Sequence, residues 1–156
     1  MTETVLDKFL RYVIIDTQSK EDSESYPSTA KQFDLLNLLV KELKNLGVPQ
    51  VSIDEHGYVM ATLSANVSIK VPAIGFVAHV DTSPEVSGAN VKPQIIKEYK
   101  GGDIILPGDS NIVIRESENP ALKTALGKMI VTSDGTTLLG ADDKAGIAIT
   151  MTALQQ

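Results

Sequence analysis

Two stretches near the N-terminus repeat apolar residues at the three- and four-residue spacing of an amphipathic helix. The first begins after Thr4, which can cap a helix, and ends near Asp16. The second covers residues 29–46 and stops before Gly47, a residue suited to the position that follows a helix. The sequence therefore predicts two helices with buried apolar faces, joined by a polar, solvated loop over residues 18–27.

Shorter runs rich in β-branched residues follow the second helix. Residues 51–53 and 58–63 flank a turn-forming Asp-Glu-His-Gly sequence, which predicts a β-hairpin. His56 lies in that turn, where a lone histidine is usually exposed, and it is assigned no role. Further short strands are predicted over residues 94–99, 111–115 and 129–132.

A continuous apolar run, Ala-Ile-Gly-Phe-Val-Ala at residues 73–78, leads into His79 and Asp81. Such a run predicts a strand buried on both faces, as in a parallel sheet. Side chains alternate along a strand, so His79 and Asp81 project from the same face at its end. A carboxylate beside an imidazole can fix its tautomer and make the other ring nitrogen a better metal ligand. The irregular, proline-rich stretch that follows, residues 82–128, is expected to form a wall beside this pair.

A second group of charged residues opens the last apolar segment. Gly-Ala-Asp-Asp-Lys-Ala-Gly at residues 140–146 precedes small and apolar residues, which predicts a buried helix starting near Asp143. The helix dipole favours acids at a helix start, so capping is one interpretation of Asp142 and Asp143. Capping requires only one carboxylate, however, and a second is less costly beside a bound cation. Together these patterns predict an α/β fold, with helices packed on a mixed, largely parallel sheet.

Composition limits the partners and the metal ligands that these two groups of residues can provide. The 156 residues carry a formal net charge of −6, which disfavours nucleic acid or an anionic membrane surface as a partner. The chain has no cysteine and only two histidines, so any metal must be held by His, Asp or Glu side chains. The sequence shows no apolar run long enough to span a membrane and no signal-peptide pattern, so a cytoplasmic location is expected.

The two motifs together resemble those of the co-catalytic di-zinc exopeptidases and deacylases. The first is His-Val-Asp-Thr-Ser-Pro-Glu at residues 79–85, and the second is Thr-Ser-Asp-Gly-Thr-Thr-Leu-Leu-Gly-Ala-Asp-Asp-Lys-Ala-Gly at residues 132–146. Within that group, the second motif is most similar to the peptidase T family of tripeptide aminopeptidases, and the likeness covers essentially the whole chain. The resemblance implies a zinc-dependent enzyme that releases the N-terminal residue from tripeptides, with two zinc ions per complete subunit.

The resemblance also implies roles for individual residues. His79 matches a ligand of one zinc, Asp142 matches the carboxylate that bridges both ions, and Asp81 matches the catalytic aspartate that orients the histidine. The peptide bond between Asp142 and Asp143 is expected to be cis, as is common in this family. The family's general-base glutamate and its remaining zinc ligands find no match in this sequence. Residues 1–156 are accordingly expected to form the N-terminal portion of a catalytic domain, inactive by itself, without the later catalytic segments and the lid or dimerisation domain.

Two alternatives remain open at this point. Similar motifs serve enzymes that hydrolyse N-acyl amino acids, and a relative that has lost its general base would be a non-catalytic peptide- or metal-binding protein. For the peptidase, the expected partners are small peptides, with no nucleic acid and no membrane. A homodimer is one assembly that the resemblance allows for the full-length protein.

Overall fold

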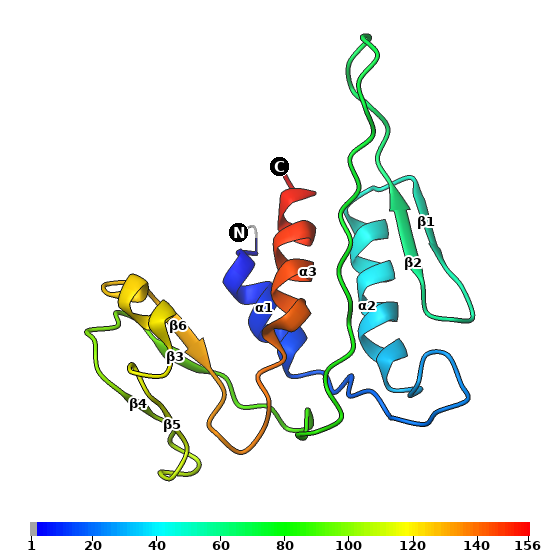
Figure 1. The fold of residues 1–156 in the computed structure, drawn as a ribbon. Coiled ribbons are helices and arrows are strands. Elements are labelled where there is room, and N and C mark those ends of the chain that lie inside the picture. The colour runs from blue at the N-terminus through cyan, green and yellow to red at the C-terminus, as the bar shows by residue number, and fades with distance from the viewer. Residues whose placement is uncertain (1–2) are drawn as a thin grey trace.

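A computed structural model describes residues 3–156 as a mixed α/β structure with short, antiparallel strand pairs (Figure 1). The elements in chain order are α1 (Val5–Val13), α2 (Gln32–Asn45), β1 (Gln50–Ile53), β2 (Val59–Thr62), β3 (Gln94–Ile96), β4 (Ile104–Ile105), β5 (Val113–Ile114), the 3-10 helix η1 (Pro120–Ala125), β6 (Ile130–Thr132) and α3 (Ala141–Ala153). The predicted mixture of helices and strands is confirmed. In this described part of the chain, no helix combines the length and the apolar character needed to cross a membrane.

The two N-terminal helices form where the apolar spacing predicts them. Thr4 closes a capping box with Asp7: its hydroxyl accepts the Asp7 N–H at 3.2 Å, and its own N–H donates to the Asp7 carboxylate at 2.9 Å. Helix α2 begins three residues later than expected, after a turn at residues 30 and 31, and no side chain caps its start. Gly47 follows α2 with a φ of +78°, a left-handed conformation that glycine adopts without strain.

The main core lies between the helices. Helix α1 packs against α3, and α2 packs against the β1–β2 hairpin. The buried members of this core are Phe9, Tyr12, Val13, Leu35, Leu39, Leu43, Val48, Val91, Ile147, Ala148 and Met151. They come from all three helices and from two loops, so this core fixes the start of α3 relative to α1.

A second, smaller unit occupies most of residues 94–132. Its strands pair as β3 with β6 and β4 with β5, both antiparallel. It has its own apolar cluster, formed by Tyr99, Ile104, Leu106 and Leu122. In Figure 1 this unit lies to one side of α1. The predicted short strands are confirmed, although each is two or three residues long.

The apolar run at residues 73–79 is extended but pairs with no strand within residues 3–156. The side chains of Phe76 and Val77 are 74% and 96% exposed. The prediction of a buried strand is therefore wrong for this part of the chain, because burial of both faces requires neighbouring strands on either side. The largely parallel sheet is likewise not confirmed, since the parallel pairing seen here is an isolated bridge between Gln18 and Thr82.

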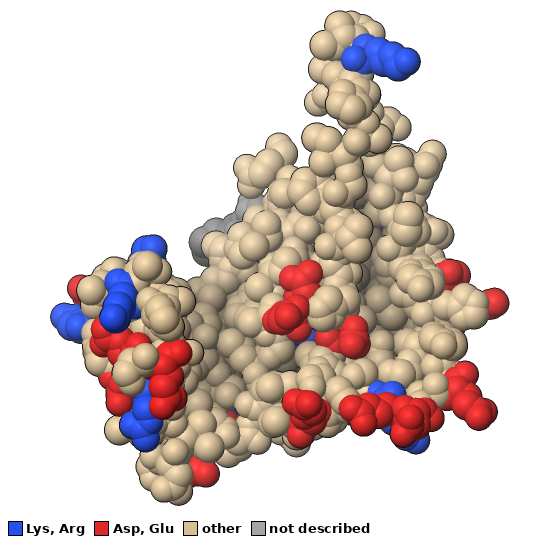
Figure 2. Space-filling view, viewed as in Figure 1, with Lys and Arg blue, Asp and Glu red and all other residues tan. Residues whose placement is uncertain are grey.

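An arm formed by residues 63–72 projects beyond β2 and leads into this extended run (Figure 1). Leu63, Val67 and Ile69 on the arm are 52–71% exposed. The arm is almost free of charge in the space-filling view (Figure 2). Exposed apolar surface on this scale is typical of a face that packs against more protein.

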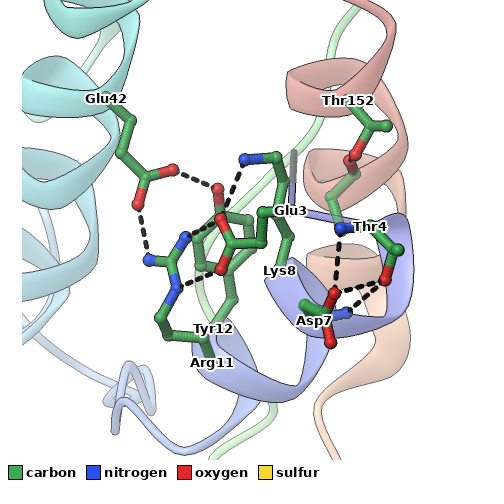
Figure 3. Close-up of polar contacts among 9 residues, drawn as sticks. Glu3, Thr4, Asp7, Lys8, Arg11, Tyr12, Glu42 and Thr152 are labelled. Carbon is green, nitrogen blue, oxygen red and sulfur yellow. Dashed lines mark hydrogen bonds and ion pairs between the residues drawn. The ribbon is translucent and has the colours of Figure 1, made fainter. Parts of the chain in front are cut away.

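An ion network joins α1 to α2 (Figure 3). The carboxylate of Glu42 accepts hydrogen bonds from Arg11 and from the hydroxyl of Tyr12. Glu3 pairs with the same Arg11 at 2.8 Å and with Lys8 at 3.1 Å. Tyr12 is fully buried, so Glu42 provides the hydrogen-bond partner that its hydroxyl requires.

Replacing Glu3 with glutamine is expected to make the free energy of unfolding less dependent on pH in the acidic range. The hydrogen bond from Arg11, which outweighs partial desolvation, holds the pKa of Glu3 at about 2, below its ordinary value of 4.5. A lowered pKa in the folded state stabilises the protein above the ordinary value, and this contribution is lost as the pH falls toward the folded-state pKa. The wild type should therefore lose stability more steeply than Glu3→Gln between about pH 5 and about pH 3.

Urea unfolding followed by circular dichroism at several pH values measures that slope. Glu98→Gln serves as the matched control, because Glu98 forms a looser, more exposed pair with Lys100 at 3.8 Å. Equal slopes for the wild type and Glu3→Gln would show that the Glu3 carboxylate gains nothing from its partners in the folded state.

Candidate functional site

The structure brings the three predicted site residues together. His79 lies between the two acids: its Nε2 is 2.9 Å from Asp142 Oδ1, and its Nδ1 is 3.2 Å from Asp81 Oδ1. The same Nδ1 is 3.1 Å from the backbone carbonyl oxygen of Asp81. The end of the extended run thus meets the start of α3, although 63 residues of chain separate His79 from Asp142.

The two neighbouring aspartates at the start of α3 have different positions. The Asp143 carboxylate accepts the N–H of Gly146 at 3.1 Å and so caps the helix. The side chain of Asp142 is 94% exposed and lies against His79. Capping is therefore the correct interpretation for Asp143, whereas Asp142 retains free carboxylate oxygen. The peptide bond between them is cis, as predicted.

An open pocket surrounds these residues. It is lined by His79, Asp81, Thr82, Ser83, Leu138, Gly140, Ala141 and Asp142. The predicted wall from the irregular stretch is confirmed only for Thr82 and Ser83, because most of the later residues form the second unit with its own core. Figure 2 shows acidic side chains gathered near the middle of the face on which α3 begins.

The two acids change the proton affinity of His79. Burial of the ring lowers the pKa of His79, but the hydrogen bond with Asp142 and the negative charge of Asp81 outweigh it, and the net pKa lies above its ordinary value. The same carboxylates would favour a metal cation placed between Nε2 and Asp142. Imidazole nitrogen and carboxylate oxygen are both ordinary zinc ligands, so the donor set fits that ion.

Within residues 3–156, no point is shared by three or more His, Cys, Asp or Glu side chains in a way that could hold a metal ion. His79 Nε2 and the Asp142 carboxylate form a pair of potential donors, 2.9 Å apart. Asp81 lies on the other side of the ring, where it can orient the imidazole without touching a metal bound at Nε2.

Residues 17–19 also belong to the surroundings of the site, and the sequence pattern missed them. Thr17 is fully buried, and the Gln18 amide donates to the carbonyls of Pro84 and Val86, each at 3.1 Å. Gln18 and Ser19, at the start of the predicted solvated loop, are half-buried and hydrogen-bonded, whereas most of its later residues are exposed. These contacts join stretches more than sixty residues apart, and no local pattern marks them.

Comparison with known proteins identifies relatives for the chain. No family model matches it. Proteins named peptidase T match it closely: that of Halothermothrix orenii is 56% identical over 151 residues, that of Geobacillus thermodenitrificans 53% over 154, and that of Clostridium acetobutylicum 54% over 152. These matches cover 97–99% of the chain and 37–38% of each relative, so the chain spans a little over a third of the relatives' length. His79, Asp81 and Asp142 all lie within the matched part. By sequence, the chain is therefore a peptidase T relative.

Proposed function

We propose that this chain is the N-terminal portion of the catalytic domain of a zinc-dependent aminopeptidase that releases the N-terminal residue from tripeptides. The observation that carries the proposal is the placement of His79 between Asp81 and Asp142, in a chain 53–56% identical to proteins named peptidase T. The general-base glutamate, the remaining zinc ligands and a lid or dimerisation domain would lie outside residues 1–156.

The proposed roles follow from which side-chain nitrogen and oxygen atoms are available to bind a metal. His79 Nε2 would hold one zinc, and the exposed Asp142 carboxylate has two oxygens with which to hold the same zinc and a second one. The Asp81 backbone carbonyl lies 3.1 Å from His79 Nδ1 and can accept its N–H, and the Asp81 carboxylate lies 3.2 Å from the same nitrogen. Both favour the tautomer whose Nε2 lone pair faces outward. Asp143 holds the first turn of α3 and so fixes where Asp142 projects. When bound, a pair of zinc ions acidifies water and polarises a carbonyl group, the chemistry that peptide hydrolysis requires.

The larger fold proposed for the complete domain is an α/β structure with a largely parallel sheet. Its support is the extended, apolar run at residues 73–79, whose side chains are exposed on both faces in the described part of the chain. Alternating exposed apolar side chains with unpaired backbone suit a strand flanked by other strands and covered by helices. His79 and Asp81 would then lie at the carboxyl end of that strand, where ligands bind in open α/β sheets.

The proposed setting is the cytoplasm, with small peptides as partners and neither nucleic acid nor membrane. The net charge of −6 and the acidic residues near the site favour small substrates over polyanions. A homodimer is the proposed assembly of the full-length protein.

The decisive experiment is a substrate comparison with the full-length protein that contains this chain. Trialanine should be cleaved to alanine and dialanine, chelation should abolish cleavage, and added zinc should restore it. N-acetylated trialanine and N-acetyl amino acids should remain intact. Hydrolysis of the N-acetyl amino acids instead would identify a deacylase, and zinc or peptide binding without any turnover would identify a binding protein; either result would overturn the proposal.

A further inference from the structure

Residues 17–19 pair with the backbone on both sides of Asp81. The Thr82 N–H donates to the Thr17 carbonyl at 3.3 Å, and the Ser19 N–H donates to the Thr82 carbonyl at 2.9 Å. The Thr17 hydroxyl donates to the carbonyl of Val80 at 2.6 Å. Thr17 and Thr82 are both buried, so these bonds are shielded from water. The position of Asp81 therefore depends on the stretch that follows α1.

The same stretch is tied to the start of α3 by a buried lysine. Lys144 is 1% exposed, and its Nζ donates to the carbonyl of Ile15 at 2.7 Å. Burying an ammonium group is costly unless it is hydrogen-bonded or paired. The carboxylate of Asp16, which pairs with Lys31 at 2.8 Å, also acts on Lys144 through its charge. Lys144 follows Asp142 by two residues, so this bond anchors the turn that carries Asp142.

Gly140 lies where the stretch beside Asp81 and the side chain of Lys144 come close together. It has a φ of +76°, and a Cβ added to it would lie 3.2 Å from Thr82 Cγ2 and 3.6 Å from Lys144 Nζ. The turn before Asp142 is therefore packed between Thr82, which follows Asp81, and the side chain of Lys144.

We propose that residues 15–19, here named the bracket, set the separation between His79 and Asp142, and that Thr17 and Lys144 are positioning residues acting through it. A shared metal tolerates only small errors in the positions of its ligands, about 0.5 Å or less. His79 and Asp142 come from different elements, and the bracket is bonded to the chain beside each of them. The inference rests on the proposed function in one respect, that a metal binds between these two residues.

The test measures zinc affinity in the full-length protein by chelator competition, together with the absorption spectrum of the cobalt-substituted protein. Lys144→Met removes the amine but keeps most of the stem, and Thr17→Val removes the hydroxyl but keeps the shape. Each variant should bind zinc about 10–100-fold more weakly and shift the cobalt spectrum, because outer-shell partners typically act on this scale. Thr17→Ser, which restores the hydroxyl, should return both readouts close to wild type.

Two control variants remove the same groups elsewhere. Lys8 is another buried lysine, paired with Glu3 (Figure 3). The Thr152 hydroxyl donates to the carbonyl of Ala148 at 2.7 Å. Lys8→Met and Thr152→Val should lower thermal stability without changing zinc affinity or the cobalt spectrum.

The outcomes separate this proposal from the function on which it rests. A wild-type protein that binds no zinc would refute the proposed function itself. Wild-type zinc binding that Thr17→Val and Lys144→Met leave unchanged, or that the two controls weaken equally, would overturn the bracket while leaving the function standing. If Lys144→Met fails to fold, the comparison of Thr17→Val with Thr17→Ser decides the question.

Discussion

Replacing Asp142 with alanine in the full-length protein is expected to remove nearly all bound zinc and to lower peptidase turnover by more than about 100-fold. Loss of an outer-shell partner alone typically costs about 10–100-fold, and Asp142 is proposed to contact both ions directly. Its carboxylate is the only one placed against His79 Nε2 in the described part of the chain. The substitution should leave α3 intact, because the helix cap comes from Asp143.

The neighbouring aspartate provides a close control for Asp142→Ala. Asp143→Asn also removes one carboxylate charge at the start of α3, but its amide oxygen can still accept the N–H of Gly146. Zinc content, measured by atomic absorption on dialysed protein, should fall only for Asp142→Ala. Two tightly held zinc ions per chain in Asp142→Ala would show that Asp142 is not the shared ligand.

The helices could be predicted from sequence because their determinants are local. The apolar spacing of α1 and the capping box between Thr4 and Asp7 both lie within one short stretch. The hairpin of β1 and β2 follows in the same way from a turn sequence between two β-rich runs. Helix α2 shows the limit of this reasoning, since it begins at Gln32, three residues later than the sequence pattern predicts.

The run at residues 73–79 was predicted less well because its burial depends on other segments. An apolar, β-branched sequence indicates an extended chain, and the chain is extended here. Whether it is paired and covered depends on which strands lie beside it, and within residues 3–156 none does. A local pattern carries no information about such neighbours.

The site residues also fall into those that the local sequence could identify and those that depend on distant parts of the chain. His79, Asp81 and Asp142 could be selected because their motifs combine unusual residue types at a strand end and a helix start. Thr17 and Lys144 could not be selected, because both donate to distant backbone carbonyls. Lys144, for example, donates to a carbonyl 129 residues away, and any residue type could supply that acceptor. Backbone acceptors are the same for every residue, so contacts of this kind become visible only in the folded chain.

Replacing Asp81 with asparagine is expected to lower turnover by about 10–100-fold while most of the zinc is retained. Two acceptors lie near His79 Nδ1: the Asp81 carboxylate at 3.2 Å and the Asp81 backbone carbonyl at 3.1 Å. The backbone acceptor survives the substitution, so the ring can keep the tautomer that leaves Nε2 free for metal. What is lost is the negative charge that raises the pKa of His79 and makes the ring a stronger donor.

The measurement pairs kcat for trialanine with zinc content, each compared between Asp81→Asn and wild type. Glu85→Gln is the matched control, because Glu85 belongs to the same motif but lies beside residues 18–21 and not beside the imidazole. Wild-type turnover in Asp81→Asn would remove Asp81 from the catalytic machinery. Loss of zinc in proportion to turnover would instead show that the carboxylate is needed to hold the metal, because the carbonyl at 3.1 Å then fails to keep His79 in its ligating tautomer.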